Sequence, residues 1–299
     1  MVNFQDELKK RTEEIEAVLK SYLPREEGFA KTMAQAMNYS VLAGGKRLRP
    51  MLILETCRMF GGEDKLAYPF MAAMEMIHTH SLVHDDLPAL DNDDYRRGRL
   101  TTHKVYGEAM GVLSGVALLN YAYEVMLTAF DLAEDEKARA RVINALKVMS
   151  HKTGLYGMLG GQSVDVENDG KPMSREMINY IYENKTSALI EGSMMAGAIL
   201  GGASAEEVAV VEKAASGIGL AFQIQDDILD VTSTMEVLGK PIGSDEKNHK
   251  ASYVSFEGLE KAREDVALYT NSAVARMDSL VVKNEFLNEL LLYLISREK

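Results

Sequence analysis

The sequence is poor in cysteine, proline and basic residues, and each scarcity excludes a class of protein. Cys57 is the only cysteine among 299 residues, which excludes an internal disulfide framework and a zinc site built from cysteines. Six prolines are too few for a proline-rich or low-complexity chain. So little cysteine suits a reducing compartment, and we expect a cytoplasmic protein.

The balance of charge excludes a class of partner. Lysine and arginine number 33 against 45 aspartates and glutamates, which gives a net charge of -12. Nucleic-acid-binding proteins normally carry a basic surplus or stripe, so no nucleic acid is expected as a partner. An acidic protein that handles anions must instead bring metal cations or place its few basic side chains with care.

Long hydrophobic runs are also scarce. The longest, residues 110–130, is barely long enough to cross a bilayer, carries Asn120 and Glu124, and lacks basic flanks. The beginning of the sequence has no apolar segment typical of a secretory signal. We therefore expect no stable membrane span, and we interpret 110–130 as a buried core helix.

Hydrophobic residues at helical spacing, in contrast, are abundant. The expected helices cover about 13–22, 27–42, 50–59, 66–87, 104–131, 134–153, 174–202, 204–233 and 257–296. Loops are expected where glycine, proline, aspartate and asparagine cluster, at 43–50, 88–103, 167–173 and 239–250. No segment shows the sustained alternation typical of a strand, and no linker divides the chain. The prediction is therefore an all-α protein with one domain over residues 1–299.

Two aspartate clusters are the main chemical signal. The first comes at the end of the apolar helix 66–87 and comprises Asp85, Asp86, Asp91, Asp93 and Asp94. Alone, such a cluster is more often a solvated acidic turn. Against that interpretation, the helix is too apolar to be exposed, the aspartate doublet follows it directly, and two arginines come next, mixing both charge signs in one short loop.

The spacing of the first cluster has a backbone reason. Asp85 and Asp91 are six residues apart, which places them on different faces of a continuous helix. Pro88 disfavours helical geometry at Leu87. The chain can therefore bulge there and bring Asp91 back toward Asp85.

The second cluster is Asp226, Asp227 and Asp230, within the apolar run 217–231. Asp226 and Asp230 are four residues apart and share one helix face. One such triplet is more often a surface patch, but two clusters on apolar helices favour a metal site. Mg²⁺ is usually held by one or two carboxylates with phosphates and water, so two clusters facing each other across a cavity, with a diphosphate bridging the ions, fit it.

Calcium is the competing ion. The loop that begins at Asp91 does not match a calcium-binding EF-hand, because Arg96 stands at loop position 6 and Thr102 at position 12. Glycine and glutamate belong at those positions. The sequence therefore favours magnesium.

Because basic residues are scarce, their placement is informative. The ones that stand out are Lys46, Arg47 and Arg49 in the turn 44–50, Arg96 and Arg97 after the first aspartate cluster, and the single lysines Lys185, Lys240 and Lys250. Arginine offers phosphate a planar fork and lysine a point charge, so the group indicates one or two diphosphate sites. The turn is not a P-loop, because the G-x-x-x-x-G-K-[ST] pattern and a preceding strand are absent.

Seven segments, in family order, resemble those of the farnesyl/geranylgeranyl diphosphate synthase family of trans-prenyltransferases, in its bacterial short-chain type. They are GGKRLRP (44–50), IHTHSLVHDDLPALDNDDYRRG (77–98), GMLGGQSVD (157–165), NKTSALI (184–190), FQIQDDILD (222–230), GKPIGSD (239–245) and KASYV (250–254). The resemblance covers essentially the whole chain. It implies an isoprenoid-synthase bundle of about ten or more helices around a central substrate cavity.

The resemblance also implies an activity. A transferase of this family condenses isopentenyl diphosphate head-to-tail with an allylic diphosphate such as dimethylallyl or geranyl diphosphate. It uses about three Mg²⁺ ions per active site, for which Mn²⁺ substitutes. The resemblance further implies a homodimer, with helix 110–130 as a candidate interface.

Residue by residue, the resemblance assigns the following roles. Asp85 and Asp91 would bind two Mg²⁺ ions with Asp86 supporting them, and Asp226 would bind a third, with Asp227 and Asp230 acting through water. The allylic diphosphate would be gripped by Arg96, Lys185 and Lys240, and isopentenyl diphosphate would be held by Lys46, Arg49, His78 and Arg97. Thr186 and Gln223 would stabilise a carbocation, Lys250 would close a loop over the diphosphate, and His80 and Ser81 would wall the tunnel for the growing chain.

Three of these residues have plainer interpretations. His78 alone would be taken for a core histidine, but it stands about two turns before Asp85 on one helix. Gln223 would otherwise be an ordinary buried amide, and Thr186 a hydroxyl bonded to its own backbone.

The sequence departs from the family pattern at two positions. Val116 stands where the family usually has aspartate, and we expect this to tune activity rather than abolish it. His80 stands where many farnesyl synthases have tyrosine or phenylalanine. Because histidine is smaller than tyrosine and polar, we expect an imperfect stop to chain growth. The predicted main product is farnesyl diphosphate, with geranylgeranyl diphosphate as the alternative.

Three other functions are weighed against this one. A terpene cyclase would lack the set Lys46, Arg49 and Arg97, and its second metal motif usually contains asparagine, serine and glutamate. A non-catalytic synthase subunit would have lost one or both aspartate clusters. An acidic metal buffer would bind metal without diphosphate.

Overall fold

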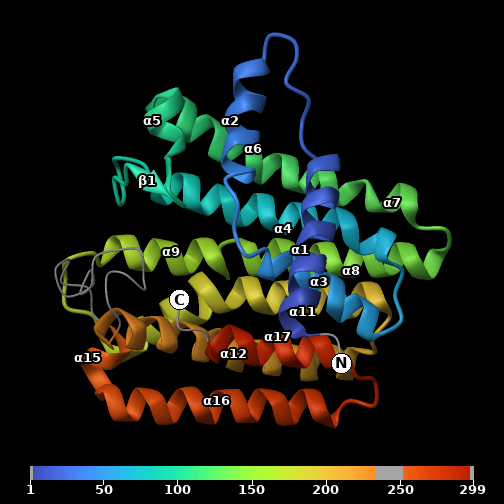
Figure 1. Cartoon of the computed structure of the whole chain (residues 1–299), viewed down its shortest axis with the longest axis vertical. Helices are drawn as coiled ribbons and strands as arrows, with labels where there is room; N and C mark the ends of the chain where they lie inside the picture. Colours follow the sequence, from blue (N-terminus) through green and yellow to red (C-terminus); the bar gives the residue numbers. More distant parts are fainter. Residues whose placement is uncertain (1–2, 233–251, 297–299) are drawn as a thin grey trace. The chain divides into compact units, whose positions relative to one another are not determined.

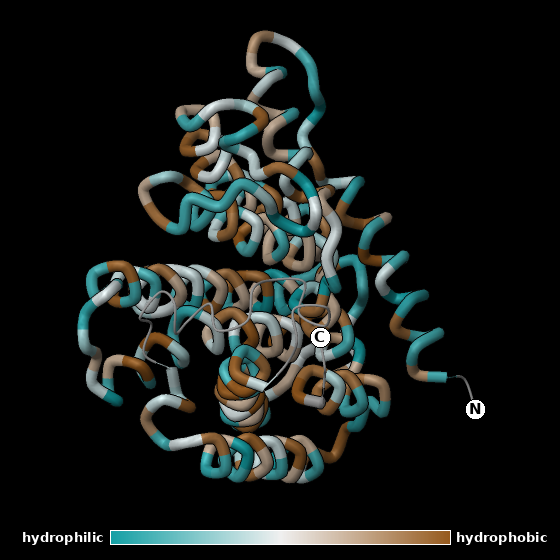
Figure 2. The backbone as a smooth tube through the Cα atoms, turned by 60° about the vertical axis from the view of Figure 1, so that its left-hand side comes forward, coloured by the Kyte–Doolittle hydropathy of each residue, from teal (hydrophilic) through white to brown (hydrophobic). Residues whose placement is uncertain are grey.

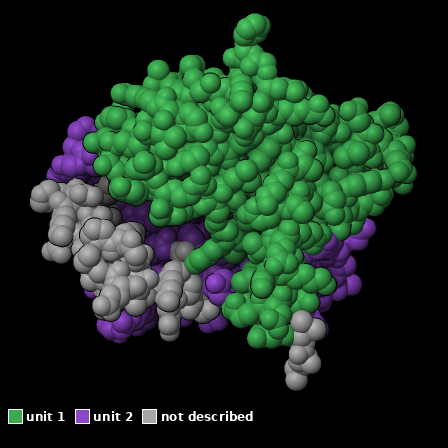
Figure 3. Space-filling model, turned by 45° about the horizontal axis from the view of Figure 1, so that its top comes forward, with its two compact units in different colours: residues 1–54, 62–143 green, residues 55–61, 144–299 purple. Residues whose placement is uncertain are grey.

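The computed structural model describes residues 3–232 and 252–296, and it is almost entirely helical (Figure 1). The predicted all-α class is therefore confirmed. By its internal contacts the chain divides into two compact units, residues 1–54 with 62–143 and residues 55–61 with 144–299 (Figure 3). The boundaries fall within α3 (Leu48–Met59) and α8 (Glu136–Thr153). A single domain with a central cavity stays a prediction.

The first unit is built around the pairing of two long helices. Beside parts of α3 and α8, its elements are α1 (Phe4–Ser21), α2 (Lys31–Val41), α4 (Asp64–Asp85), β1 (Tyr95–Arg96), β2 (Arg99–Leu100), α5 (Thr102–Tyr106), α6 (Glu108–Leu127) and α7 (Ala129–Leu132). The two long helices are α4 and α6. α4 packs along α6, and α2 and α5 lie against α6 as well. α1 packs on α4, and its buried residues are Ile15 and Leu19, four residues apart on one face. Hydrophobic and hydrophilic residues alternate along this helix (Figure 2).

The expectation of no strand is wrong at one place. β1 and β2 form a two-residue antiparallel hairpin in which Tyr95 pairs with Leu100 and Arg96 with Arg99. Arg97 and Gly98 connect them with positive φ angles of 54° and 74°. Positive φ at both central residues defines the turn whose twist suits a two-residue hairpin. So short a hairpin leaves no alternation of hydrophobic residues for a sequence pattern to reveal.

α6 is apolar along its whole length but is only partly buried. Together with α7 it forms a segment, Glu108–Leu132, that is long and apolar enough to cross a membrane by length and composition, and 39% of the most apolar 18-residue window in this segment is buried in the structure. The expectation of a buried core helix therefore holds for one face, which packs on α4 through Leu118, Ala122 and Met126. The other face exposes Val112, Leu113, Val116 and Leu127.

The second unit is organised around its longest helix, α12. Its elements beside part of α8 are α9 (Met158–Glu167), α10 (Arg175–Ile181), the π-helix η1 (Tyr182–Ser187), α11 (Ala188–Gly201), α12 (Ala205–Thr232), α15 (Tyr253–Glu257), α16 (Leu259–Ser279) and α17 (Glu285–Ser296). α12 packs along α16 on one side and against α11 and η1 on others.

Three features of this unit differ from the sequence expectations. The run 257–296, expected as one helix, is divided into α16 and α17. α9 was not expected, because the glycine pair Gly160-Gly161 lowers helix propensity. The run 174–202 was expected as one helix, but η1 interrupts it between α10 and α11. Single π-helical turns inside helices occur frequently at functional sites, which directs attention to residues 182–187.

Candidate active site

The first aspartate cluster folds back as its proline predicts. The N–H of Asp91 donates a hydrogen bond to the carbonyl oxygen of Asp85, with an N–O distance of 2.9 Å, and the N–H of Asn92 donates to that of Leu87 at 3.1 Å. Pro88 lies inside both loops and disfavours helical geometry at Leu87. The predicted return of Asp91 to Asp85 is confirmed, with Asp85 half-buried and Asp91 exposed.

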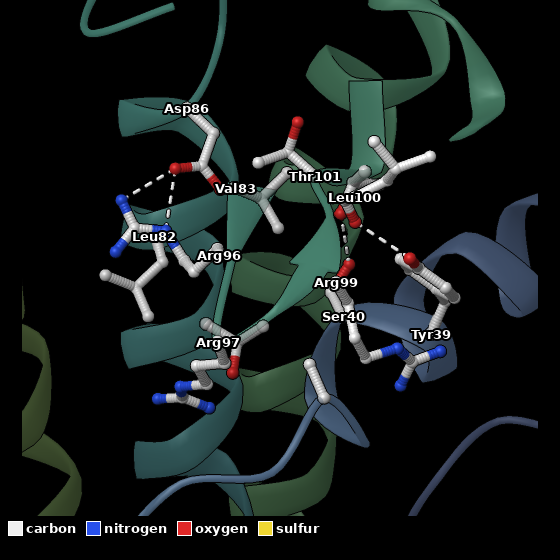
Figure 4. A pocket seen from close by; sticks show the side chains of 13 residues that line it. Tyr39, Ser40, Leu82, Val83, Asp86, Arg96, Arg97, Arg99, Leu100 and Thr101 are labelled. Carbon is white, nitrogen blue, oxygen red and sulfur yellow. Dashed lines mark hydrogen bonds and ion pairs between the residues drawn. The ribbon is translucent and has the colours of Figure 1, made fainter. Parts of the chain in front are cut away.

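Asp86 points away from solvent toward the hairpin. Its side chain is buried, and its Oδ1 accepts hydrogen bonds from Nε and Nη2 of Arg96 at 2.7 and 2.6 Å (Figure 4). Burial raises the pKa of Asp86, and the hydrogen bond and charge of Arg96 offset only part of this. Burial lowers the pKa of Arg96, but Asp86 more than compensates, so that pKa is raised. The predicted diphosphate ligand Arg96 is thus oriented by the second residue of the aspartate doublet.

A small pocket lies beside the hairpin that carries Arg96 and Arg97. Its empty space is about 370 Å³, solvent at its mouth included, and it is lined by α2, the end of α4 and the hairpin (Figure 4). The Tyr39 hydroxyl donates to the carbonyl oxygen of Leu100 at 2.8 Å, and the Arg99 guanidinium lies over the Tyr39 ring, 4.2 Å from its centroid. These contacts fix the hairpin to α2 and so fix the backbone of Arg96 and Arg97.

Arg97 packs against the turn 44–50. Its guanidinium donates to the carbonyl oxygen of Gly44, and a Cβ added at Gly45 would lie 2.8 Å from its Cζ. Gly45 also has a φ of 136°, a conformation that only glycine adopts readily. The glycine pair is therefore needed both for the turn and for the approach of Arg97.

The structure brings together two further residues of the predicted isopentenyl diphosphate site. Nη1 of Arg49 lies 3.5 Å from Nε2 of His78. The His78 ring is half-buried and surrounded by protein atoms, so its pKa falls well below the ordinary value, first through desolvation and then through the nearby charges of Arg49, Arg97, Arg96 and Arg47. His78 is therefore neutral at pH 7 and is not a fully buried core histidine. Lys46 is exposed on the same turn.

Arg47 differs from the interpretation of the turn as three substrate-facing cations. Its side chain is buried and its backbone has a φ of 51°. Nε donates to Glu16 Oε1 at 2.6 Å, Nη1 to Glu75 Oε1 at 2.5 Å, and Nη2 to the carbonyl oxygen of Val41 at 2.7 Å. The sequence pattern did not reveal this, because Glu16 and Glu75 lie on other helices.

In the second unit, η1 is held between two helices at glycine positions. A Cβ added at Gly161 of α9 would lie 2.3 Å from the backbone nitrogen of Lys185, and one at Gly219 of α12 would lie 2.0 Å from Oγ of Ser187. Backbone contacts this close are possible only where no side chain intervenes. The glycines therefore allow η1 to approach both helices.

This packing sets the side chains of the predicted Lys185-Thr186 pair. Nζ of Lys185 lies 2.6 Å from Oδ2 of Asp165 on α9, and the Thr186 hydroxyl donates to Oε1 of Gln223 on α12 at 2.8 Å. The plainer interpretation of Thr186 as bonded to its own backbone is therefore wrong. The sequence analysis gave Asp165 no role, although the residue ends one of the segments that carry the family resemblance.

The three aspartates of the second cluster have different surroundings. Asp226 is half-buried, whereas Asp227 and Asp230 are each 4% exposed. Oδ2 of Asp227 accepts hydrogen bonds from the hydroxyl of Tyr182 and from the N–H of Tyr253 at 2.6 Å. Asp227 therefore joins η1 and the start of α15 to α12, and Tyr182 is a residue that sequence reasoning missed. Asp226 is the most accessible carboxylate of the three.

Of these three aspartates, only Asp227 lines the open pocket of about 650 Å³ in the second unit, solvent at its mouth included. Its polar wall contains Asp165, Lys185, Thr186, Gln223, Asp227 and Ser252, and its apolar wall contains Met173, Ile178, Ile181 and Tyr182. A lysine, hydroxyl and amide oxygens and an apolar surface in one pocket suit a molecule with an anionic head and a hydrocarbon body.

The carboxylates fit magnesium that is shared with a substrate. Among residues 3–232 and 252–296, no group of three or more histidine, cysteine, aspartate or glutamate side chains is arranged to hold a metal ion by itself. Accessible aspartates in ones and twos are the donor set that Mg²⁺ uses when phosphate oxygens and water complete its shell. Lys240, Lys250 and the loop 239–250 lie outside the described residues.

The two residues predicted to wall the product tunnel lie on different faces of α4. His80 is buried against α6, where its Nδ1 lies 2.9 Å from the carbonyl oxygen of Gly115 and its ring centroid 4.6 Å from that of His84. Burial lowers the pKa of His80 to about 4. Ser81 is half-buried and stands three residues after His78 and four before Asp85, so it shares their face.

Known proteins resemble this chain over most of its length. A family model described as polyprenyl synthetase matches residues 30–289. The chain is 43% identical over 266 residues to the farnesyl diphosphate synthase of Geobacillus stearothermophilus, covering 89% of this chain and 88% of that protein. It is 40% identical over 292 residues to the geranylgeranyl diphosphate synthase of Cyanophora paradoxa, covering 93% and 95%. A solved structure of geranyltransferase from Helicobacter pylori, complexed with magnesium and isoprenyl diphosphate, matches with a TM-score of 0.82 and 30% identity, covering 99% and 97%.

Proposed function

Because the chain belongs to the polyprenyl synthetase family, we propose that it carries out the elongation of an allylic diphosphate by isopentenyl diphosphate. The chain is a transferase of this class, and farnesyl diphosphate is its best-supported product. The observation that supports the chemistry is the pocket of the second unit, where Lys185, Thr186 and Gln223 meet an apolar wall.

The reaction breaks one bond and makes another. The allylic C–O bond breaks and its electron pair leaves with diphosphate; the double bond of isopentenyl diphosphate then attacks the allylic cation to form a C–C bond. A proton is lost from the carbon next to the new cationic centre, and an oxygen of the released diphosphate accepts it. No side-chain base is therefore required, and the protein acts by placing charge and excluding water.

Each described residue of the site has a part in this scheme. Lys185 and Arg96 bind the departing diphosphate, while Lys46, Arg49, His78 and Arg97 hold isopentenyl diphosphate. Neutral His78 donates a hydrogen bond to an oxygen without adding charge to the arginine cluster. Thr186 and Gln223 present oxygen atoms to the developing cation.

The metal ligands proposed are Asp85, Asp91 and Asp226, the more accessible members of the two clusters. Magnesium bound there supplies charge neutralisation to the departing diphosphate. Asp86 orients Arg96, and Asp227 holds Tyr182 and Tyr253. Three ions per site and replacement by Mn²⁺ are part of this proposal.

Geranylgeranyl diphosphate is a second candidate product, since a synthase named for it is 40% identical to this chain. We favour farnesyl diphosphate because the farnesyl diphosphate synthase of Geobacillus stearothermophilus is 43% identical to this chain over most of both proteins, and a solved FPP/GFPP synthase covers 99% of both chains.

We also propose a cytoplasmic homodimer. The exposed apolar residues of α6, Val112, Leu113, Val116 and Leu127, suit burial against a second copy. The single buried cysteine suits a reducing compartment. Light scattering after size exclusion tests the dimer, and a monomeric mass at micromolar concentration contradicts it.

The decisive experiment incubates the protein with Mg²⁺, isopentenyl diphosphate and each allylic diphosphate in turn, and identifies the prenyl alcohols after dephosphorylation. A fifteen-carbon alcohol is expected. A mainly twenty-carbon alcohol keeps the class and changes the product. No product with any starter contradicts the proposal and favours a cyclase or an accessory subunit.

A further inference from the structure

The turn 44–50 places one of its three basic side chains in the interior. Lys46 is exposed and Arg49 is half-buried, whereas Arg47 is 2% exposed. Arg47 also has a left-handed backbone conformation, with φ of 51°, which residues other than glycine adopt only when their surroundings hold them there. Something other than solvent therefore determines the conformation of this turn.

The guanidinium of Arg47 joins the turn to three other segments. Its Nε donates to Glu16 of α1, its Nη1 to Glu75 of α4, and its Nη2 to the carbonyl oxygen of Val41, the last residue of α2. The planar fork of arginine is suited to such divergent bonds, whereas an ammonium group cannot reproduce them. The turn is thus fastened through one side chain.

The segments fastened by Arg47 carry the proposed isopentenyl diphosphate ligands. Glu75 stands three residues before His78 on α4, so the two share a helix face. Arg49 reaches His78, and Arg97 packs on Gly45 within the same turn. A shift of the turn relative to α4 would therefore separate these ligands from one another.

The two glutamates also compensate charge. One arginine between two carboxylates leaves a surplus negative charge beneath a cluster of cations. Burial lowers the pKa of Arg97, while the charges of Glu75 and Glu16 act in the opposite direction. The glutamates thus stabilise the crowded cations while no diphosphate is bound.

We propose that Arg47, held between Glu16 and Glu75, is a positioning residue that sets the geometry of the isopentenyl diphosphate site. It touches neither substrate and acts through Lys46, Arg49 and Arg97. The inference rests on the proposed function, because it names isopentenyl diphosphate as the ligand of this cluster.

The test compares steady-state kinetics of wild type and Arg47→Lys, which keeps the charge and loses the fork. We expect KM for isopentenyl diphosphate to rise at least about tenfold, with kcat and KM for geranyl diphosphate changed by less than about twofold. Arg139→Lys, in an exposed ion pair with Glu136 of the same unit, is the matched control and is expected to leave all three constants unchanged.

A second variant separates positioning from folding. Arg47→Met combined with Glu75→Gln removes the two buried charges and leaves only the carboxylate of Glu16, whose side chain is 25% exposed, without Arg47. The double variant is therefore expected to melt closer to wild type than Arg47→Met alone. Its KM for isopentenyl diphosphate is expected to stay raised. Glu16→Gln, at the more accessible partner, is expected to raise that KM by about threefold and serves if the other variants do not fold.

Several outcomes would overturn the inference. Unchanged KM in Arg47→Lys, equal increases of KM for both substrates, or recovery of wild-type KM in the double variant would each show a merely structural role. An active wild type with any of these results leaves the proposed function intact. A wild type that incorporates no isopentenyl diphosphate removes the proposed function and this inference with it.

Discussion

The hydroxyl of Thr186 donates a hydrogen bond to the side-chain oxygen of Gln223, 2.8 Å away, and so joins the π-helix η1 to α12. Because its proton is committed to Gln223, the lone pairs of the Thr186 oxygen are free to face a positive charge. Both residues line the pocket that also contains Lys185. The pair therefore combines a structural contact with a group suited to stabilise a carbocation.

Thr186→Val removes this hydroxyl and nearly preserves the shape of the side chain. We expect kcat to fall by about ten- to a hundredfold with KM for geranyl diphosphate little changed, because the interaction strengthens only as positive charge develops. Thr270→Val, at a half-buried threonine of α16, is the control and should stay within about twofold of wild type. A parallel rise of KM would show that Thr186 acts in ground-state binding instead.

Asp91→Asn keeps the backbone hydrogen bond to Asp85 and removes one carboxylate charge. We expect kcat to fall at least about a hundredfold and the Mg²⁺ concentration for half-maximal rate to rise. Asp94 lies in the same loop, where its carboxylate pairs with Lys104 at 2.7 Å, so Asp94→Asn is the matched control. Equal losses in the two variants would mean that only the total charge of the loop matters.

Gly161→Ala tests the close packing of η1 on α9. The added Cβ would lie 2.3 Å from the backbone nitrogen of Lys185, so η1 must move. We expect a loss of about 1–3 kcal/mol in the free energy of unfolding and a fall in activity greater than that loss explains. Gly217→Ala, whose Cβ would meet the Tyr269 carbonyl oxygen at 3.2 Å, should have a smaller effect on both. Denaturation in urea and the rate under native conditions measure the two quantities.

His80 predicts a loss of stability in mild acid. Burial lowers its pKa from 6.5 to about 4, so between these values the unfolded chain binds a proton that the folded chain does not. The free energy of unfolding therefore falls as pH drops from 6.5 toward 4, with about 3 kcal/mol from this group. His78, whose pKa is also lowered, acts in the same direction.

Urea denaturation at pH 7.5 and 4.5 measures this effect. His80→Gln can still donate to the Gly115 carbonyl oxygen, and it should reduce the difference in unfolding free energy between the two pH values. His151→Gln, at an exposed histidine, should leave the difference as in wild type. An undiminished difference in His80→Gln would contradict the prediction.

The length of the product should respond to position 80. His80→Ala is expected to raise the twenty-carbon share, and His80→Tyr to make the product almost wholly fifteen-carbon, because the larger ring narrows the space along α4. Ser81→Phe, on the face shared with Asp85, should shorten the product further. Chromatography of the prenyl alcohols measures the distribution of chain lengths. An unchanged distribution in His80→Ala would contradict a role of His80 in setting product length.

Much of the site follows from local sequence. The return of Asp91 to Asp85 depends on Pro88, which acts on its immediate neighbour, and it is present as predicted. The approach of Arg49 to His78 was implied by the family resemblance, and the structure confirms it at 3.5 Å. The helical class was equally accessible, since hydrophobic period is a local property.

The sequence by itself thus determined the helical class, the bend after α4 and the types of side chain available for the chemistry. Only the tertiary structure decided which of them turn inward. Arg47 is buried because Glu16 and Glu75 come from other helices, and Asp165 meets Lys185 because Gly161 lets η1 approach α9. Such contacts form between segments that are distant in sequence, because a buried charge is costly unless an opposite charge or a hydrogen-bonding group lies next to it. The sequence around each residue does not show which distant segment will supply that partner.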